Sequence, residues 1–215
     1  PAPPIADILR ALPASTLSEH DADALFEAIL SGALDPAQIA GVLALIAARG
    51  PTPDEVVGAA RAMRRHVTPI PARDPATLVD TCGTGGAPKT FNVSTAAALV
   101  AAAAGARVAK HGNRSRTGRG SAEVLQALGV NVDAPPDVQA RCLDQAGVCF
   151  CFAIHHHPAA RHAAPIRRAL KHPTIFNILG PLTNPARAGR QVIGVFEESL
   201  VPLVAHALAR LGSVR

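Results

Sequence analysis

Apolar residues recur three and four positions apart through the first third of the chain, the spacing that places them on one face of a helix. This pattern predicts four helices, at Ile5–Leu12, Ser18–Leu30, Pro36–Arg49 and Pro53–His66. The segments Asp35-Pro36-Ala37-Gln38 and Thr52-Pro53-Asp54-Glu55 mark two of the helix starts. Each places a capping side chain, a proline at the first helical position and a capping-box partner. The sequence therefore predicts a helical domain over residues 1–70.

After a proline-rich linker at 69–75, short apolar runs alternate with helical segments. The runs predict strands at Leu78–Thr81, Ala106–Lys110, Val130–Val132, Val148–Ala153 and Gln191–Phe196. The intervening segments predict helices at Ser94–Ala104, Ser121–Leu128, Val138–Ala146, Pro158–Leu170 and Leu200–Leu211. Such alternation is typical of a mostly parallel sheet with right-handed crossovers. The predicted fold class is α/β, with a small N-terminal helical domain and a larger α/β domain over 76–215.

The composition excludes several classes of protein. A chain of 215 residues buries roughly 70% of its unfolded surface, enough for a core. No apolar run reaches the roughly 18 residues of a membrane span, and the N-terminus lacks the pattern of a secretory signal. Four cysteines do not make a disulfide scaffold, so a cytoplasmic location is expected. Cys149 and Cys151 are interpreted as small buried side chains rather than metal ligands.

The net charge is +5 and the isoelectric point is about 9.6, values that raise the question of nucleic-acid binding. The chain has no tryptophan or tyrosine and only six phenylalanines to stack on bases. Its basic residues also gather in loops that suit phosphate. A small anionic substrate explains the charge with fewer assumptions.

The segment from Asp80 to Thr95, DTCGTGGAPKTFNVST, carries the strongest functional signal. A strand end leads into a glycine loop, and Asn92-x-Ser94-Thr95 then opens an alanine-rich helix. Glycines let a ligand approach the backbone, and a helix start offers N–H groups and a positive dipole, so the pattern predicts a phosphate cradle. A Walker A loop needs a glycine directly before its lysine, and Pro88 stands there instead, which excludes that motif. Pro88 also occupies the position of the third glycine of a dinucleotide fingerprint, which excludes that motif as well.

A second loop has the same character. Lys110-His111-Gly112-Asn113-Arg114-Ser115 follows a predicted strand, and a further basic stretch leads into a helix near Ser121. Adjacent parallel strands that end in such loops face one crevice at the carboxyl edge of the sheet.

These two segments, together with Phe176-Asn177-Ile178-Leu179-Gly180-Pro181-Leu182-Thr183-Asn184-Pro185, resemble three signature segments of the anthranilate phosphoribosyltransferase family. The resemblance covers essentially the whole chain. It implies a nucleoside phosphorylase/phosphoribosyltransferase-like fold, in which 171–188 returns to the N-terminal helices. It also implies transfer of the phosphoribosyl group of phosphoribosyl pyrophosphate to the amine of anthranilate, in tryptophan biosynthesis. Mg²⁺ as cofactor and a homodimer formed through the helical domain follow from the same resemblance.

The resemblance also implies a set of substrate-binding residues. These are Gly83, Thr84, Gly85, Gly86, Ala87, Thr90, Asn92, Val93, Ser94, Thr95, Lys110, His111, Gly112, Asn113, Ser115, Ser121 and Arg167. Ser94 would also touch Mg²⁺, Lys110 would neutralise phosphate charge, and Arg167 would meet the anthranilate carboxylate. No catalytic nucleophile is assigned, because stabilisation of the leaving pyrophosphate is electrostatic.

Three departures from the family pattern stand out. Ala87 occupies the place of an aspartate in a loop one residue shorter, and 116–119 replaces a serine-rich stretch. Family members also continue past residue 215 to an Asp-Glu pair for a second Mg²⁺, so the chain is expected to be truncated at its C-terminus. Two alternatives stay open: a non-catalytic nucleic-acid-binding relative, and a pyrimidine nucleoside phosphorylase-like enzyme that shares the glycine loop.

The run His155-His156-His157 suggests a metal site. On an extended segment, consecutive side chains point in alternating directions, so three adjacent histidines do not readily bind one ion. The favoured interpretation is a polar loop after a strand, with ligation through His155 and His157 as the weaker one.

Overall fold

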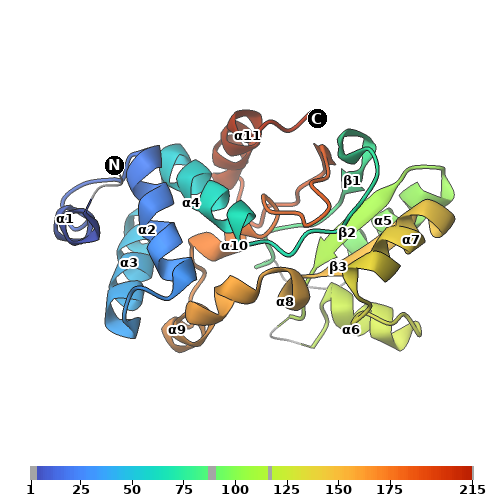
Figure 1. The fold of residues 1–215 in the computed structure, drawn as a ribbon, viewed down its shortest axis with the longest axis horizontal. Coiled ribbons are helices and arrows are strands. Elements are labelled where there is room, and N and C mark those ends of the chain that lie inside the picture. Colours follow the sequence, from blue (N-terminus) through green and yellow to red (C-terminus); the bar gives the residue numbers. More distant parts are fainter. Residues whose placement is uncertain (1–3, 87–90, 116–117, 215) are drawn as a thin grey trace. The chain divides into compact units, whose positions relative to one another are not determined.

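The computed structural model describes residues 4–86, 91–115 and 118–214. Contacts divide the chain into two compact units. The first comprises 1–67, 157–183 and 199–211, and the second comprises 68–156, 184–198 and 212–215. Figure 1 labels the elements of both. Among the described helices, none combines the length and the apolar character that crossing a bilayer requires.

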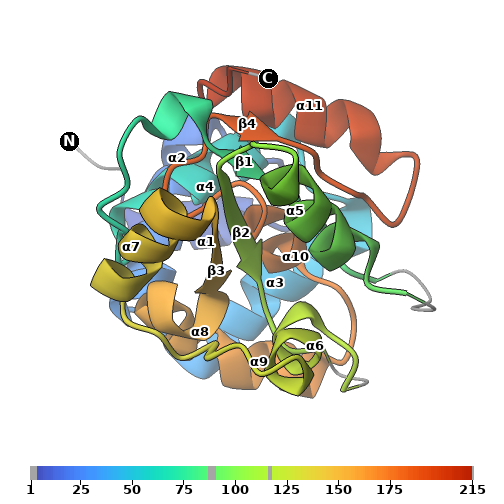
Figure 2. The same cartoon turned by 90° about the vertical axis from the view of Figure 1, so that its right-hand side faces the viewer.

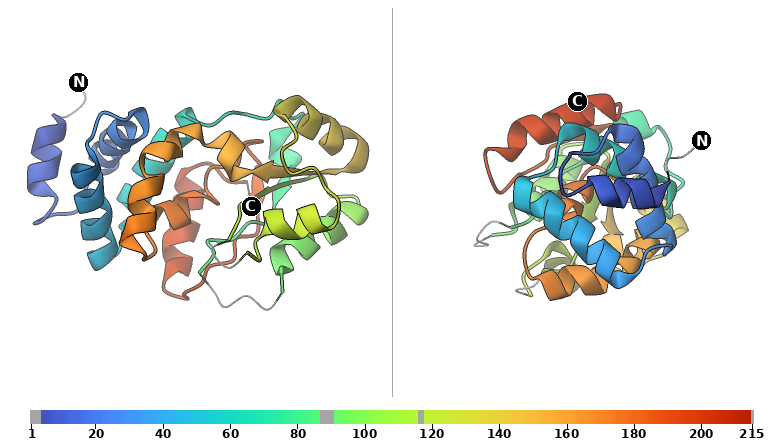
Figure 3. Two further views of the ribbon diagram at one scale, coloured as in Figure 1. Left: turned by 90° about the horizontal axis from the view of Figure 1, so that it is seen from below. Right: turned by 90° about the vertical axis from the view of Figure 1, so that its left-hand side faces the viewer.

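In its described residues, the first unit contains helices and no strand. They are α1 (Ile5–Ala11), α2 (Glu19–Ser31), α3 (Pro36–Arg49), α4 (Pro53–Arg65), α9 (Ala164–Leu170), α10 (Ile175–Leu179) and α11 (Leu200–Arg210), with a 3-10 turn at Pro158–His162. The right-hand view of Figure 3 looks onto its N-terminal helices, coloured blue. Leu25, Phe26 and Ile29 of α2 are fully buried, and so are Leu43 and Ile46 of α3. The apolar stripes read from the sequence thus form this core.

The predicted caps are present. Asp35 accepts hydrogen bonds from the backbone of Ala37 and Gln38, and the Asp35 N–H donates in return to Gln38 Oε1. Thr52 and Glu55 form the same capping box at α4. These reciprocal bonds satisfy N–H groups that a helix start leaves without intrahelical partners.

The second unit is a four-stranded parallel sheet with helices around it (Figure 2). Its strands are β1 (Val79–Asp80), β2 (Val108–Gly112), β3 (Val148–Phe152) and β4 (Arg190–Gln191), in the order β3-β2-β1-β4. Val79 pairs with Val108 and Arg190, and Val108 pairs with Val148. The other elements are a 3-10 turn at Pro75–Thr77 and the helices α5 (Val93–Ala103), α6 (Ser121–Ala127), α7 (Pro136–Ala146) and α8 (Ala153–His156). The predicted parallel α/β class is confirmed.

Strand β3 contributes side chains to two separate apolar clusters, because alternate side chains of a strand point to opposite faces. Cys149 and Cys151 lie with Leu78 and Leu143 in one cluster. Phe150 and Phe152 lie with Ala122, Leu125 and Val132 in the other. The two cysteines are therefore core side chains, as the sequence indicated.

Three predicted elements differ from the structure. Val130–Val132 is not a strand: Val130 N–H bonds to Leu125 O and closes α6, and Val132 is buried under the sheet instead of joining it. The strand predicted over Gln191–Phe196 is confined to Arg190–Gln191 and one bridge at Gly194. The helix predicted over Pro158–Leu170 breaks into a 3-10 turn and α9, since Pro165 has no N–H to continue a helix through that point.

Both returning segments pack on α4. The family resemblance places 171–188 with the N-terminal helices, and the contact of α10 with α4 agrees with this. The sequence pattern groups 200–211 with the α/β domain, but α11 also contacts α4. Arg64 of α4 donates to Leu182 O and Leu211 O, and Arg210 of α11 pairs with Glu19 and Asp54. The limits of the domains as independent folding units stay a prediction.

Candidate functional site

The glycine loop follows the end of β1. Gly83 forms a parallel bridge with Gly194, and a Cβ at Gly83 would lie 2.9 Å from Gly194 O. Gly85 and Gly86 have φ of 71° and 94°, the left-handed region that favours glycine. A Cβ at Gly86 would also lie 2.9 Å from Cγ of Phe196. Each loop glycine of the motif thus has a steric or conformational reason to be glycine.

The loop returns to the sheet at the first turn of α5. Thr81 Oγ1 donates to Ser94 O over 2.8 Å, which joins the end of β1 to that turn. Asn92 precedes the helix and donates from Nδ2 to Arg119 O over 3.2 Å, which joins the two sequence loops. Ala87 and Thr90, predicted as binding residues, lie outside the described residues, as do Arg116 and Thr117.

Lys110 is brought to the same helix start. It is 2% exposed, and its Nζ lies 3.3 Å from Ser94 Oγ and 3.4 Å from His111 O. Burial lowers the pKa of Lys110, while the nearby Asp80 carboxylate opposes that shift. An ammonium group held by two long hydrogen bonds beside a helix N-terminus is suited to receiving an anion.

Thr95 lies differently from the other hydroxyls of the motif. Its side chain is 2% exposed and, within the described chain, its Oγ1 has no hydrogen-bond partner. Thr95, Lys110 and Phe150 line a mostly apolar cavity of about 120 Å³ between α5 and β3.

The loop after β2 is held by a carboxylate that the sequence analysis did not single out. Glu123 of α6 accepts from Ser115 N at 3.3 Å and Gly120 N at 2.9 Å. Ser121 is the first residue of α6, and a Cβ at Gly112 would lie 3.0 Å from Ser121 Cβ. An acidic residue two positions into a helix that follows a glycine-rich basic loop is the signal that identifies Glu123.

Asn113 and Arg114 complete that loop. Asn113 Oδ1 accepts from Arg114 N over 2.8 Å, and the Arg114 guanidinium lies 5.5 Å from the centroid of the Phe152 ring. Arg114 is thus stacked on an aromatic side chain rather than held in a solvated loop.

Arg167 belongs to the helical unit, and its neighbours come from the third signature segment. Its guanidinium carbon lies 5.1 Å from the Phe176 ring centroid, and Nη2 lies 3.5 Å from Asn177 Oδ1. Burial lowers the pKa of Arg167. Within the described residues, Arg167 forms no ion pair with a carboxylate, whereas Arg49, Arg61, Arg65 and Arg210 each do. A partly desolvated guanidinium without an acidic partner is suited to binding a carboxylate ligand.

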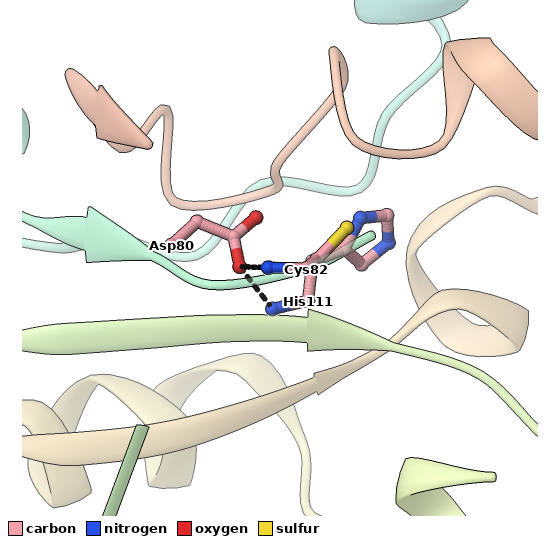
Figure 4. A group of neighbouring side chains, drawn as sticks. All are labelled: Asp80, Cys82 and His111. Atoms are coloured by element: carbon pink, nitrogen blue, oxygen red, sulfur yellow. Dashed lines mark hydrogen bonds between the residues drawn. The ribbon is translucent and has the colours of Figure 1, made fainter. Parts of the chain in front are cut away.

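Asp80, Cys82 and His111 form a buried group between the two loops (Figure 4). Asp80 Oδ1 accepts from the backbone N–H of Cys82 at 3.1 Å and of His111 at 3.0 Å. Its Oδ2 accepts from Asn184 Nδ2 at 2.8 Å. The sequence marks Asp80 only as part of a strand end and indicates no role for Asn184, although both stand in signature segments.

The histidine run begins in a short helix and not in the polar loop that the sequence predicted. His155 and His156 lie in the short helix α8. His155 Nε2 pairs with Asp133, while His156 bonds to Thr68 O and Gln139 Oε1. These two rings therefore serve different partners. Among the described residues, the group around Asp80 is the one set of three that clusters as metal ligands would.

Two family models match the chain. Residues 7–67 match the helical bundle domain of a glycosyl transferase family, and residues 75–215 match the a/b domain of such a family. The chain belongs to this glycosyl transferase family.

Curated members of this glycosyl transferase family are about half identical to the chain. Anthranilate phosphoribosyltransferase of Methylobacillus flagellatus is 53% identical over 191 residues, which are 88% of this chain and 56% of the relative. The enzyme of the same name from Moorella thermoacetica is 49% identical over 98% of this chain and 62% of its own length. The chain thus spans about 60% of the length of these relatives. The resemblance to anthranilate phosphoribosyltransferase is confirmed.

Solved structures in the family share the fold. Anthranilate phosphoribosyltransferase from Thermus thermophilus superposes with a TM-score of 0.90 at 44% identity, over 96% of this chain and 64% of that one. The enzyme from Saccharomyces cerevisiae in complex with phosphoribosyl pyrophosphate and Mg superposes with a TM-score of 0.87 at 28% identity, over 97% of this chain and 63% of that one.

Proposed function

We propose that this protein transfers the phosphoribosyl group of phosphoribosyl pyrophosphate to the amine of anthranilate and releases pyrophosphate, a step of tryptophan biosynthesis. The observation that carries the proposal is the meeting of Lys110 Nζ and Ser94 Oγ, 3.3 Å apart, beside a glycine loop with left-handed residues. The relatives of about 50% identity that carry the name of this enzyme support it.

The pyrophosphate end of the substrate is assigned to the second unit. Its groups are the backbone of Gly83 to Gly86, the first turn of α5, Lys110 and the Ser121 hydroxyl. Breaking the anomeric bond builds negative charge on pyrophosphate, and donors already in place stabilise that charge without reorganising. No protein nucleophile is needed, because the anthranilate amine attacks once it is held close and in line.

Mg²⁺ is the proposed cofactor, and the donor set suits it. Mg²⁺ prefers oxygen ligands and is usually shared between one or two protein groups and substrate phosphates. Ser94 Oγ supplies such an oxygen beside Lys110, where the phosphates would lie. When bound, the ion neutralises charge on the leaving pyrophosphate. The relative from Saccharomyces cerevisiae with bound phosphoribosyl pyrophosphate and Mg supports this assignment.

Anthranilate recognition is assigned to Arg167 for the carboxylate, and to Asn113, Gly83 and the His111–Gly112 backbone along the path of the ring. The support for Arg167 is its burial and its contacts with Phe176 and Asn177. The relative from Saccharomyces cerevisiae that was solved in complex with 4-fluoroanthranilate supports this assignment.

The basic charge does not require nucleic acid. Arg49 pairs with Glu55, Arg65 pairs with Asp23 and Glu27, and Arg210 pairs with Glu19 and Asp54. Much of the positive charge of the helical unit is therefore neutralised by its own carboxylates. This observation favours the transferase over the nucleic-acid-binding alternative.

Assembly and location complete the proposal. A homodimer through the helical domain rests on the family resemblance, and light scattering of the purified chain measures it. A cytoplasmic location is proposed because the four cysteines are all free thiols, as in a reducing compartment.

Calorimetric titration tests the function. The chain is titrated with phosphoribosyl pyrophosphate in the presence and absence of Mg²⁺, and with duplex DNA at about 50 and 200 mM salt. We expect phosphoribosyl pyrophosphate to bind only when Mg²⁺ is present, and anthranilate to bind after phosphoribosyl pyrophosphate. We expect no salt-sensitive binding of DNA. Salt-sensitive DNA binding without sugar-phosphate binding would reverse the choice.

A further inference from the structure

Asp80 connects the two loops of the candidate site. It is the last residue of β1 and is fully buried. One carboxylate oxygen accepts from Cys82 N–H, which opens the glycine loop, and from His111 N–H, which follows Lys110. A single atom therefore sets the separation between the start of one loop and the start of the other (Figure 4).

The carboxylate is itself held in place. Asn184 Nδ2 donates to Asp80 Oδ2 and to Ala109 O, each over 2.8 Å. Asn184 Oδ1 accepts from Ala186 N over 2.9 Å, which determines the orientation of the amide. Asp80 thus has a defined position as well as defined partners.

A metal ion is the competing explanation for this group, since Asp80, Cys82 and His111 offer ligand atoms within 4.8 Å of one another. The hydrogen bonds argue against it. Oδ1 already accepts from two N–H groups and Oδ2 from one. Burial raises the pKa of the Cys82 thiol well above its ordinary value, which disfavours the thiolate that binds metal. The ammonium group of Lys110 supplies a cation nearby.

We propose that Asp80 is a positioning residue, whose carboxylate holds the glycine loop and the Lys110–His111 segment in the arrangement that receives pyrophosphate. Removing the acceptor leaves two buried N–H groups without a partner, and the loops then separate to reach water. A binding site loses its fit when its supporting groups shift by a fraction of an ångström. The ligand part of this proposal rests on the proposed function.

The variants are Asp80→Asn, Asp80→Ala and Asn184→Ala, with Gln139→Leu as the matched control. Asp80→Asn keeps one acceptor oxygen but turns an NH₂ group toward that of Asn184. Gln139 is also buried in the same unit, and its side chain bonds to Ala134 O and His156 rather than to either loop. Thermal unfolding first ranks the variants by their loss of stability.

Hydrogen–deuterium exchange is the readout that does not depend on ligand. In the folded Asp80→Asn or Asn184→Ala variant, exchange at Cys82–Gly86 and at His111–Ser115 should rise together by about tenfold or more. Gln139→Leu of similar thermal stability should leave both segments unchanged. Unchanged exchange in the Asp80 and Asn184 variants, or an equal rise in the control, overturns the proposal.

Affinity for Mg²⁺-phosphoribosyl pyrophosphate is the second readout. It should fall about 10- to 100-fold in Asp80→Asn and more in Asp80→Ala, while Gln139→Leu keeps the wild-type value. Absence of binding by the wild-type chain contradicts the proposed function, and exchange alone then decides the positioning role. Stoichiometric Zn²⁺ binding that releases protons and disappears in Asp80→Asn would make the group a metal site and overturn the proposal.

Discussion

At Gly85 the backbone conformation alone, and not crowding by neighbouring atoms, requires glycine. Its φ is 71°, and a Cβ there would meet nothing within 4 Å in the protein. Gly85→Val should therefore fold with a cost of about 1–2 kcal/mol and weaken phosphoribosyl pyrophosphate binding at least tenfold, since the branched side chain occupies the approach to the backbone. Calorimetry measures the affinity.

Gly105→Val is the control for Gly85→Val. Gly105 has φ of 93° and equally open space, but it lies after α5 and outside the proposed cradle. The Gly105→Val variant should lose a similar amount of stability and keep the wild-type affinity for phosphoribosyl pyrophosphate. Equal affinities in the two variants would place the cradle elsewhere.

Arg167 separates the two substrates. Loss of a guanidinium–carboxylate hydrogen bond costs about 1.5–3 kcal/mol, so Arg167→Ala should weaken anthranilate binding about 10- to 100-fold. Binding of phosphoribosyl pyrophosphate should change little, as should both affinities in the Arg168→Ala variant, whose side chain is exposed on the same helix. Parallel losses for both substrates in Arg167→Ala would exclude a role specific to the carboxylate.

The effect of the buried Thr95 hydroxyl on stability and on substrate affinity can be measured. Replacing an unpartnered buried hydroxyl with a methyl group removes a desolvation cost, so Thr95→Val should raise stability by about 1 kcal/mol. Thr81→Val should lose about as much, since Thr81 Oγ1 donates to Ser94 O. A fall in phosphoribosyl pyrophosphate affinity in Thr95→Val would show that the hydroxyl turns toward the ligand, as the family resemblance implies; destabilisation would show a partner in the native protein.

At the scale of elements, the packing of α4 on α2 depends on Gly58. A Cβ at Gly58 would lie 2.3 Å from Glu19 O and 2.8 Å from the Ala22 Cβ, so the two helices would have to move apart. Gly58→Ala should cost about 1–3 kcal/mol by overpacking. Gly41 of α3 has open space, and Gly41→Ala should stabilise by about 0.5–1 kcal/mol through helix propensity. Denaturant titration of the two variants should give opposite signs; a common sign contradicts this account.

At the scale of the whole molecule, acid stability depends on Glu55 in the helical unit. Burial alone would raise its pKa, but bonds from Arg49, Thr52 N–H and Leu17 N–H outweigh it and hold the pKa below the ordinary value of 4.5. The carboxylate therefore adds stability above pH 4.5, and this contribution is lost as the pH falls through the lowered folded value. Thermal unfolding of the wild type should show this decline below pH 4.5. The Glu55→Gln variant should be less stable than the wild type at neutral pH, and its stability should fall less steeply as the pH is lowered. An unchanged decline in acid would assign the acid sensitivity to other groups.

Much of the secondary structure of this protein depends on residues close together in the chain and could therefore be predicted from the sequence. Helices α3 and α4 form where apolar spacing and capping boxes coincide, because both signals act within a few residues. The parallel sheet followed from alternation of strands and helices. The glycine loop could also be predicted from the sequence, since Gly85 and Gly86 are required by the positive φ at their own positions.

Long-range packing alone decided the remainder. Val130–Val132 has the composition of a strand, yet Val132 is buried against Phe150 and Phe152, residues brought there by β3. Asn184 meets Asp80 across 104 positions of sequence, and α11 packs on α4 through Arg210 and Arg64. Apolar spacing and capping report only the near neighbourhood of a residue along the chain. Which distant groups share a buried hydrogen bond or an apolar cluster is settled only when the tertiary fold excludes water from them and each must find a partner.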